Sequence, residues 1–159
     1  MQFKKILVPF DGSEHALSAL KVARGLAGDE ASAEVHVVTV LLATTLASNY
    51  DPSARTLARS PLSLSHFNEY ENMVSSVLDN AREDLKRDMG DAFEGASCHL
   101  VMEAVVSSSP AAGIVDYVDE HECDLVIMGR RGLGALRGVL GSVSYGVLHA
   151  VDIPVLTVK

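Results

Sequence analysis

The sequence predicts an α/β fold, an open parallel sheet with helices on both faces in a three-layer αβα arrangement. Short runs rich in β-branched and other apolar residues alternate with segments of helical periodicity, from the first residues to the last. The runs are apolar almost throughout, which is typical of strands that are covered on both sides. Right-handed crossovers leave few other ways to bury both faces of such strands.

The chain begins with a strand, a helix and a second strand. Residues 5–10 form a short apolar run, and the Asp11-Gly12-Ser13 turn that follows has the chemistry of a helix cap. From residue 14 to residue 27, apolar side chains recur at helical spacing. Residues 34–42 are rich in β-branched side chains and predict a strand that is buried on both faces.

The segment after this strand breaks the alternating pattern. Residues 43–65 contain serine, threonine, asparagine and two prolines, without a clear period. A connection of this length is uncommon in a compact domain unless it is a lid, a partner surface or disordered. We therefore expect a long mobile loop at 43–65, inside a single domain that spans residues 1–159.

The second half of the chain resumes the alternation. Helical periodicity, and a proline suited to a first helical turn, predict three helices, of which the first is the longest. The expected helices are residues 67–89, 110–121 and 143–150, and the expected strands are residues 98–105, 124–128 and 154–158.

Composition argues against several classes of function. A formal net charge of −8 repels nucleic-acid phosphates at long range, so we expect no nucleic-acid partner. No apolar run reaches the roughly 18 residues that cross a bilayer, so we expect a cytoplasmic protein without membrane insertion. Cys98 and Cys123 lie among apolar residues and are expected to be reduced packing residues. The six histidines are scattered without metal-ligand spacing, so no protein metal site is expected.

The stretch directly after the fourth expected strand has an unusual composition. Residues 129–142, GRRGLGALRGVLGS, carry five glycines and three arginines and no acidic residue. Glycines let the backbone approach an anion closely, and a helix start beyond them offers unpaired N–H groups. The arginines Arg130, Arg131 and Arg137 supply local positive charge. The stretch is therefore either a phosphate-binding loop or a flexible loop with exposed arginines.

Three better-known motifs do not fit this stretch. A Walker A loop needs a Gly-Lys pair, which the chain lacks, and a dinucleotide fingerprint needs more glycines after the first strand. The sequence around Ser144 is close to a nucleophile elbow, but His149 precedes Asp152, whereas a hydrolase needs the acid first. We therefore expect Ser144 on a helix surface and predict no catalytic residue.

Three separated segments resemble the universal stress protein family. They are KKILVPFDGS at the start, PAAGIVDYVDEHECDLVIMGRRG in the second half and GSVSYGVLHAVDIPVLTVK at the end. The resemblance implies a Rossmann-like fold with five parallel strands. The nucleotide-binding branch of the family carries G-x2-G-x9-G-[ST]; here only eight residues separate Gly132 from Gly141. The loss of one residue within such a loop leaves the glycines at its two ends in place. Branches of the family that do not bind ATP lack these glycines, so the resemblance favours the ATP-binding branch.

The resemblance implies binding roles for ten residues. Those expected at the adenine and the ribose are Pro9, Asp11, Val40, Met128 and Gly129. Those expected at the phosphates are Gly132, Gly141, Ser142 and Val143, with Arg131 near the outer phosphates. Each has an alternative structural role: Asp11 as a turn residue, Val40 and Met128 as core residues, Ser142 as a helix cap and Arg131 as a solvent-exposed side chain.

The same resemblance implies a ligand and a partner. The ligand is ATP, with AMP or ADP as alternatives, and Mg²⁺ or Mn²⁺ is held mainly through the phosphates. The terminal strand at residues 154–158 is apolar and is expected at a sheet edge, which is an aggregation hazard when bare. The family pairs this strand with its twin in a homodimer. The alternative is that the 43–65 loop covers it.

Three functions are compatible with these features. The first is a nucleotide-dependent regulatory module of the stress response that signals to a protein partner. The second is a slow ATPase or phosphotransferase, which ranks lower because no lysine, general base or second acidic metal ligand accompanies the glycine-rich stretch. The third is a nucleotide-free protein-interaction factor.

Overall fold

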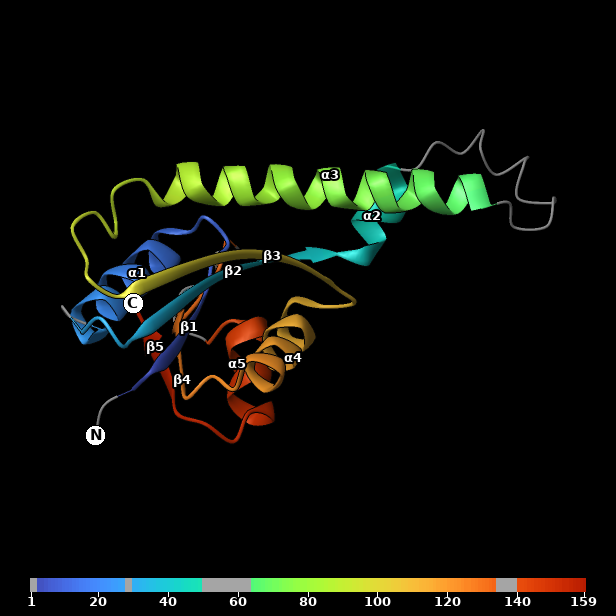
Figure 1. The fold of residues 1–159 in the computed structure, drawn as a ribbon. Coiled ribbons are helices and arrows are strands. Elements are labelled where there is room, and N and C mark those ends of the chain that lie inside the picture. The colour runs from blue at the N-terminus through green and yellow to red at the C-terminus, as the bar shows by residue number, and fades with distance from the viewer. Residues whose placement is uncertain (1–2, 28–29, 50–63, 134–139) are drawn as a thin grey trace.

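The computed structural model describes residues 3–27, 30–49, 64–133 and 140–159, which build a five-stranded sheet (Figure 1). All neighbouring strands in this sheet are parallel, in the order β3-β2-β1-β4-β5. The strands are β1 Lys5–Pro9, β2 Glu34–Leu42, β3 His99–Ser107, β4 Leu125–Gly129 and β5 Val155–Val158. The predicted five-stranded parallel sheet is confirmed.

Helices cover both faces of this sheet (Figure 1). The long helix α3 and helix α1 lie on one face, while α4 and α5 lie on the other. The helices are α1 Glu14–Ala27, α2 Ala43–Asn49, α3 Leu64–Met89, α4 Pro110–His121 and α5 Ser142–Ala150. The three-layer αβα arrangement is therefore also confirmed.

The central strands supply both halves of the core, because successive side chains of a strand point to opposite faces. On β1, Ile6 and Val8 pack with α1 and α3, whereas Leu7 packs with α4 and α5. All three are fully buried. This explains why the strand sequences are apolar at consecutive positions rather than at alternate ones.

Local capping positions the helices that follow the strands. At the start of α1, Ser13 Oγ accepts a hydrogen bond from the Ala16 N–H at 3.2 Å. Gly12, in the turn before it, has a φ of 78°, a conformation that favours glycine. Ser109 Oγ caps α4 in the same way from Ala112 N–H, also at 3.2 Å. Both caps place a helix start directly beyond the carboxyl end of a strand.

The predicted loop at residues 43–65 is wrong at both of its ends. Residues Ala43–Asn49 continue directly from β2 as helix α2, and α3 begins at Leu64. Leu46 is 3% exposed, so one buried leucine anchors this short helix in spite of its polar composition. Residues 50–63, the rest of the predicted loop, lie outside the described residues.

Both cysteines are buried free thiols, as expected. Burial raises the pKa of the Cys123 thiol to about 11, which keeps it protonated and unreactive. Of the helices in the described ranges, none combines the length and the apolar character that a membrane span requires.

Candidate functional site

A cavity of about 170 Å³ lies beyond the carboxyl ends of β1 and β4, against the second half of β2. β1 stands between β2 and β4 in the sheet, so the chain passes to opposite sides of β1 at this point. In open parallel sheets, such switch points are the usual ligand sites. The cavity is therefore the candidate functional site.

The structure brings eight of the ten predicted residues together around this cavity. The eight are Pro9, Asp11, Val40, Met128, Gly129, Arg131, Gly132 and Val143. The other two, Gly141 and Ser142, do not line the cavity and lie next to Val143 at the start of α5. Residues 134–139, in the middle of the glycine-rich stretch, lie outside the described residues.

One side of the cavity is apolar. Val38 and Val40 contribute from β2, Ile114 from α4 and Met128 from β4. Val38 and Met128 are almost fully buried, so they belong to the core as well as to the wall. This side is suited to a flat apolar ring.

Asp11 and Arg131 are the only charged side chains among the described residues that line the cavity. Asp11 Oδ1 accepts a hydrogen bond from the Ser13 N–H at 3.1 Å. Asp11 therefore has the structural role of a turn residue that its position after β1 suggested. Its other oxygen, Oδ2, faces Gly132 so closely that a Cβ atom at position 132 would overlap it. The turn after β1 and the glycine-rich stretch after β4 are thus in direct contact.

The two ends of the glycine-rich stretch are held together at its base. Gly141 N–H donates to the Arg130 carbonyl at 3.0 Å, and a Cβ atom at Gly141 would lie 3.3 Å from Arg131 Cα. Ser144 Oγ donates to the Gly129 carbonyl at 2.9 Å, with the Arg130 carbonyl at 3.3 Å. Both anchors of the shortened stretch are therefore fixed by β4 and α5.

Three expectations about this region need correction. The expected place of Ser144 on a helix surface is wrong: the residue is 2% exposed, because the short helix α5 turns it onto the end of β4. The N-cap of α5 is Gly141, and Ser142 is an exposed residue of the first helical turn. Arg130 and Arg131 are half-buried rather than solvent-exposed, since the Arg130 backbone is bonded to Val158 and Gly141 and Arg131 Cα lies close to Gly141.

Some lining residues were not predicted. They are Phe10, Ala16, Val38, Thr39, Pro110, Ile114 and Ser144. Val38 and Thr39 directly precede the predicted Val40 in the same strand, so their nearness to Val40 could have indicated them. Pro110 and Ile114 lie in the first two turns of α4, which follows β3. Because every strand-to-helix turn of a parallel sheet lies at the same edge, the start of α4 is expected near the cavity.

Groups for catalysis or for a metal are sparse here. The described lining residues include no histidine, cysteine or lysine, and the Ser144 hydroxyl is engaged by backbone carbonyls. Within the described ranges, no three or more His, Cys, Asp or Glu side chains are grouped as metal ligands.

Replacing Ser144 with alanine is expected to lower the free energy of unfolding by about 1–2 kcal/mol, because buried hydrogen bonds to the end of β4 are lost. Urea unfolding followed by circular dichroism measures this change. Ser142→Ala, at an exposed position of the same helix, is the matched control and should stay within about 0.5 kcal/mol of the wild type. Equal effects of the two variants would contradict the anchoring role of Ser144.

Comparison with known proteins identifies the family. The profile of the Universal stress protein family matches residues 2–159. The chain belongs to the universal stress protein family. Its five-stranded parallel sheet is the fold that the resemblance to universal stress proteins implied.

Individual universal stress proteins match over nearly the whole chain. MJ0531 of Methanocaldococcus jannaschii is 31% identical over 159 residues, which are 99% of this chain and 82% of that protein. The solved structure of MJ0577, from the same organism, is 29% identical and superposes with a TM-score of 0.69, covering 100% of this chain and 97% of that one. The Archaeoglobus fulgidus universal stress protein solved in complex with dAMP is 22% identical, with a TM-score of 0.53 and 100% of both chains covered.

Proposed function

We propose that this universal stress protein binds ATP in the cavity beyond the carboxyl ends of β1 and β4 and acts as a nucleotide-dependent regulatory module of the stress response. One observation carries the proposal: the Asp11 carboxylate, Gly132 and the start of α5 meet around a single cavity at the switch point of the sheet. The dAMP complex of the Archaeoglobus fulgidus protein, an adenine nucleotide on the same fold, supports it.

The two ends of the nucleotide would meet different surfaces. The apolar side of the cavity, with Val38, Val40 and Met128, would take the adenine ring, while Pro9 lies beside Asp11 at the end of β1. Asp11 Oδ2, next to Gly132, would accept a hydrogen bond from the ribose. The absence of a side chain at position 132 is what leaves room for a sugar beside this carboxylate.

The phosphates would lie at the start of α5. Its N-cap is Gly141, which has no side chain to cap the helix, so the first-turn N–H groups of Ser142 and Val143 are free of a side-chain cap. Arg131 lines the same cavity and adds positive charge. Mg²⁺ or Mn²⁺ would neutralise phosphate charge through the phosphate oxygens, with Asp11 as the nearest carboxylate among the lining residues.

The first experiment is to identify the nucleotide that the protein holds. Freshly purified protein is denatured and the released nucleotide is separated by chromatography, before and after incubation with ATP or GTP and Mg²⁺. We expect ATP near one per chain and no retention of GTP. ADP that accumulates with turnover would favour a slow ATPase, and no nucleotide under any condition would leave a nucleotide-free interaction factor.

The homodimer is part of the same proposal. β5 is paired with β4 on one side and is an edge strand among the described residues, and its Leu156 is 40% exposed. A twin strand from a second copy would pair with this edge and cover that leucine.

Leu156→Lys is therefore expected to weaken the dimer at least about tenfold, because a charge enters the paired edge. Sedimentation velocity over a concentration series measures the dissociation constant. Leu26→Lys, at a 53% exposed position of α1, is the control and should leave it unchanged. A dimer that is equally stable in both variants would locate the interface elsewhere.

A further inference from the structure

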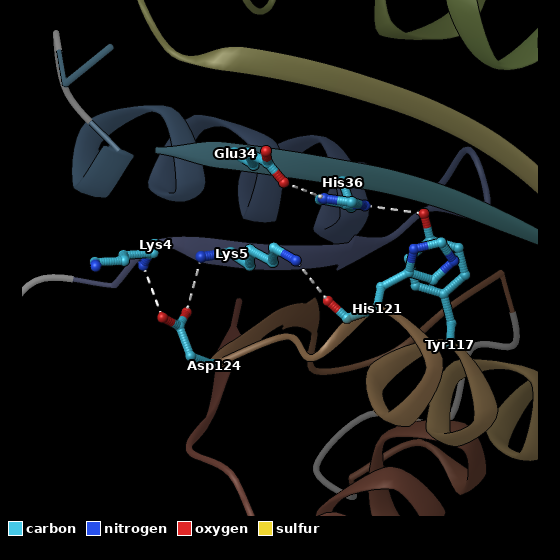
Figure 2. Close-up of polar contacts among 7 residues, drawn as sticks. All are labelled: Lys4, Lys5, Glu34, His36, Tyr117, His121 and Asp124. Atoms are coloured by element: carbon cyan, nitrogen blue, oxygen red, sulfur yellow. Dashed lines mark hydrogen bonds and ion pairs between the residues drawn. The ribbon is translucent and has the colours of Figure 1, made fainter. Parts of the chain in front are cut away.

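A chain of hydrogen bonds lies at the other end of the sheet, near the beginning of β2. Figure 2 shows the His36 ring between the Glu34 carboxylate and the Tyr117 hydroxyl, with His121 against the Tyr117 ring. His36 Nδ1 lies 2.9 Å from the Tyr117 hydroxyl, and Nε2 lies 3.2 Å from Glu34 Oε2. The rings of Tyr117 and His121 are stacked at 3.9 Å.

One protonation state satisfies every member of this chain. When the His36 ring is neutral with its proton on Nε2, this N–H donates to Glu34 and Nδ1 accepts from the Tyr117 O–H. His36 is 5% exposed and Tyr117 is 3% exposed, so water does not replace either partner. The neutral ring therefore ties helix α4 to strand β2.

Protonation of His36 breaks this arrangement. Both ring nitrogens then carry a proton, and the buried Tyr117 O–H loses its acceptor. Burial lowers the pKa of His36, while Glu34 opposes this and the nearby His121 and Lys5 add to it. Burial also raises the pKa of Tyr117, so the hydroxyl stays protonated and offers no negative charge to the ring.

Other charged and titratable groups lie around the chain. The Lys5 ammonium donates to the His121 carbonyl at 3.1 Å, which holds the end of α4 to β1 (Figure 2). The hydrogen bond with His36 lowers the pKa of Glu34, and Lys5 acts in the same direction. The remaining groups are His99 and Glu103 of β3, and Cys123 and Asp124 after α4. Among these groups, His36 is the buried one that can gain a positive charge as the pH falls.

The two elements that His36 joins also form a wall of the cavity. On α4, the lining residue Ile114 lies one helical turn before Tyr117. On β2, the lining residue Val38 lies two positions after His36, on the same face of the strand. Gly113 of α4 approaches β2 so closely that a Cβ atom there would be 2.8 Å from Val40 Cγ1. The position of α4 on β2 therefore sets the width of the cavity.

We infer that the contact between His36 and Tyr117 is a pH-sensitive latch: neutral His36 holds α4 against β2, and protonation releases it and lowers the affinity of the cavity for adenine nucleotide. The effect on affinity rests on the proposed function. Because the pKa of His36 is lowered in the fold, the latch is closed above the ordinary value of 6.5 and opens as the pH falls below it. His36 acts as a positioning residue, since it does not line the cavity.

The direct test follows the His36 ring by NMR between pH 8 and pH 5, without and with saturating ATP and Mg²⁺. The expected pKa lies below 6.5 in the free protein and falls further with ATP, because linkage is reciprocal. ATP that binds without shifting the pKa of His36 would overturn the latch. No ATP binding at pH 7.5 would overturn the proposed function itself, and the effect on affinity with it.

Variants provide the second readout, the ATP dissociation constant at pH 7.5 and pH 5.5. His36→Asn keeps an acceptor for Tyr117 but cannot take up a proton, so the pH dependence should fall at least about threefold relative to wild type. His149→Asn, at an exposed histidine of α5, is the control. Its ATP dissociation constant should depend on pH as in the wild type, and this dependence includes the part that comes from the protonation of ATP itself. An unchanged profile in His36→Asn would refute the latch.

Tyr117→Phe provides an independent test that does not rely on the folding of His36→Asn. Without the Tyr117 hydroxyl, His36 has no hydrogen-bond partner on α4, so the shift of its pKa on addition of ATP should be lost. A shift as large as in the wild type would show that Tyr117 does not couple His36 to the cavity.

Discussion

Gly132→Val is expected to lower the affinity for ATP at least about 100-fold while the fold remains intact, a loss of about 2.8 kcal/mol. A Cβ atom at this position would overlap Asp11 Oδ2, and the valine methyl groups would add to the overlap. Asp11 Oδ1 is held by the Ser13 N–H at 3.1 Å, so the carboxylate cannot move without losing that bond. The variant would therefore displace the group proposed to bind the ribose and fill its space.

The fold should tolerate this change. Gly132 is exposed, and it is not among the residues with positive φ, so its backbone conformation is open to other residues. Gly25→Val is the matched control, because Gly25 is an exposed glycine of α1 where a Cβ atom would meet no neighbouring atom within 4 Å. Isothermal titration calorimetry gives the ATP affinity, and thermal unfolding tests the fold. A folded Gly132→Val protein with wild-type affinity would place the nucleotide elsewhere.

The elements of the fold could be predicted because their signals are local. The β-branched run at Glu34–Leu42 is a strand over the predicted range, and the helical spacing of Glu14–Ala27 is helix α1. The Ala43–Asn49 segment shows where such signals fail. Its helix is held by the burial of Leu46 against the rest of the fold, and nothing in the periodicity of seven residues reveals that burial.

The site could be predicted as far as its motifs extend. Asp11 and Gly132 both belong to recognisable turn sequences, and the sheet order then brings the two into contact. Ile114 and Thr39 carry no motif, because an isoleucine in a helix and a threonine in a strand are typical of any core. Their place in the wall depends on which helix covers the end of β2, which is a property of the whole topology.

The latch was invisible in the sequence for the same reason. Eighty-one positions separate His36 from Tyr117, and the sequence patterns assign no role to any histidine. A histidine inside a β-branched strand is unusual, since burial of a titratable ring requires partners. That signal indicates a buried hydrogen-bonded histidine, but it does not say which residues satisfy the ring.

Gly113→Val is expected to lower the free energy of unfolding by about 3 kcal/mol, which is the upper range for overpacking a close contact. A Cβ atom at Gly113 would lie 2.8 Å from Val40 Cγ1 and 2.9 Å from Ser107 Cβ, so helix α4 would have to move away from β2 and β3. Neither neighbour is the end of a long flexible side chain, and both belong to strands of the sheet, Val40 to β2 and Ser107 to β3. The strain therefore falls on the packing of the helix.

Urea unfolding measures this loss, and Gly25→Val again serves as the control. Glycine is among the least favourable residues inside a helix, so valine in the open position 25 should be neutral or slightly stabilising. Val40 also lines the cavity, so the Gly113 variant should bind ATP more weakly even where it is fully folded. If Gly113→Val were as stable as Gly25→Val, α4 could move away from β2 without loss of stability. The packing of α4 on β2 would then not be tight, and the hydrogen bond between Tyr117 and His36 could not control the width of the cavity through it.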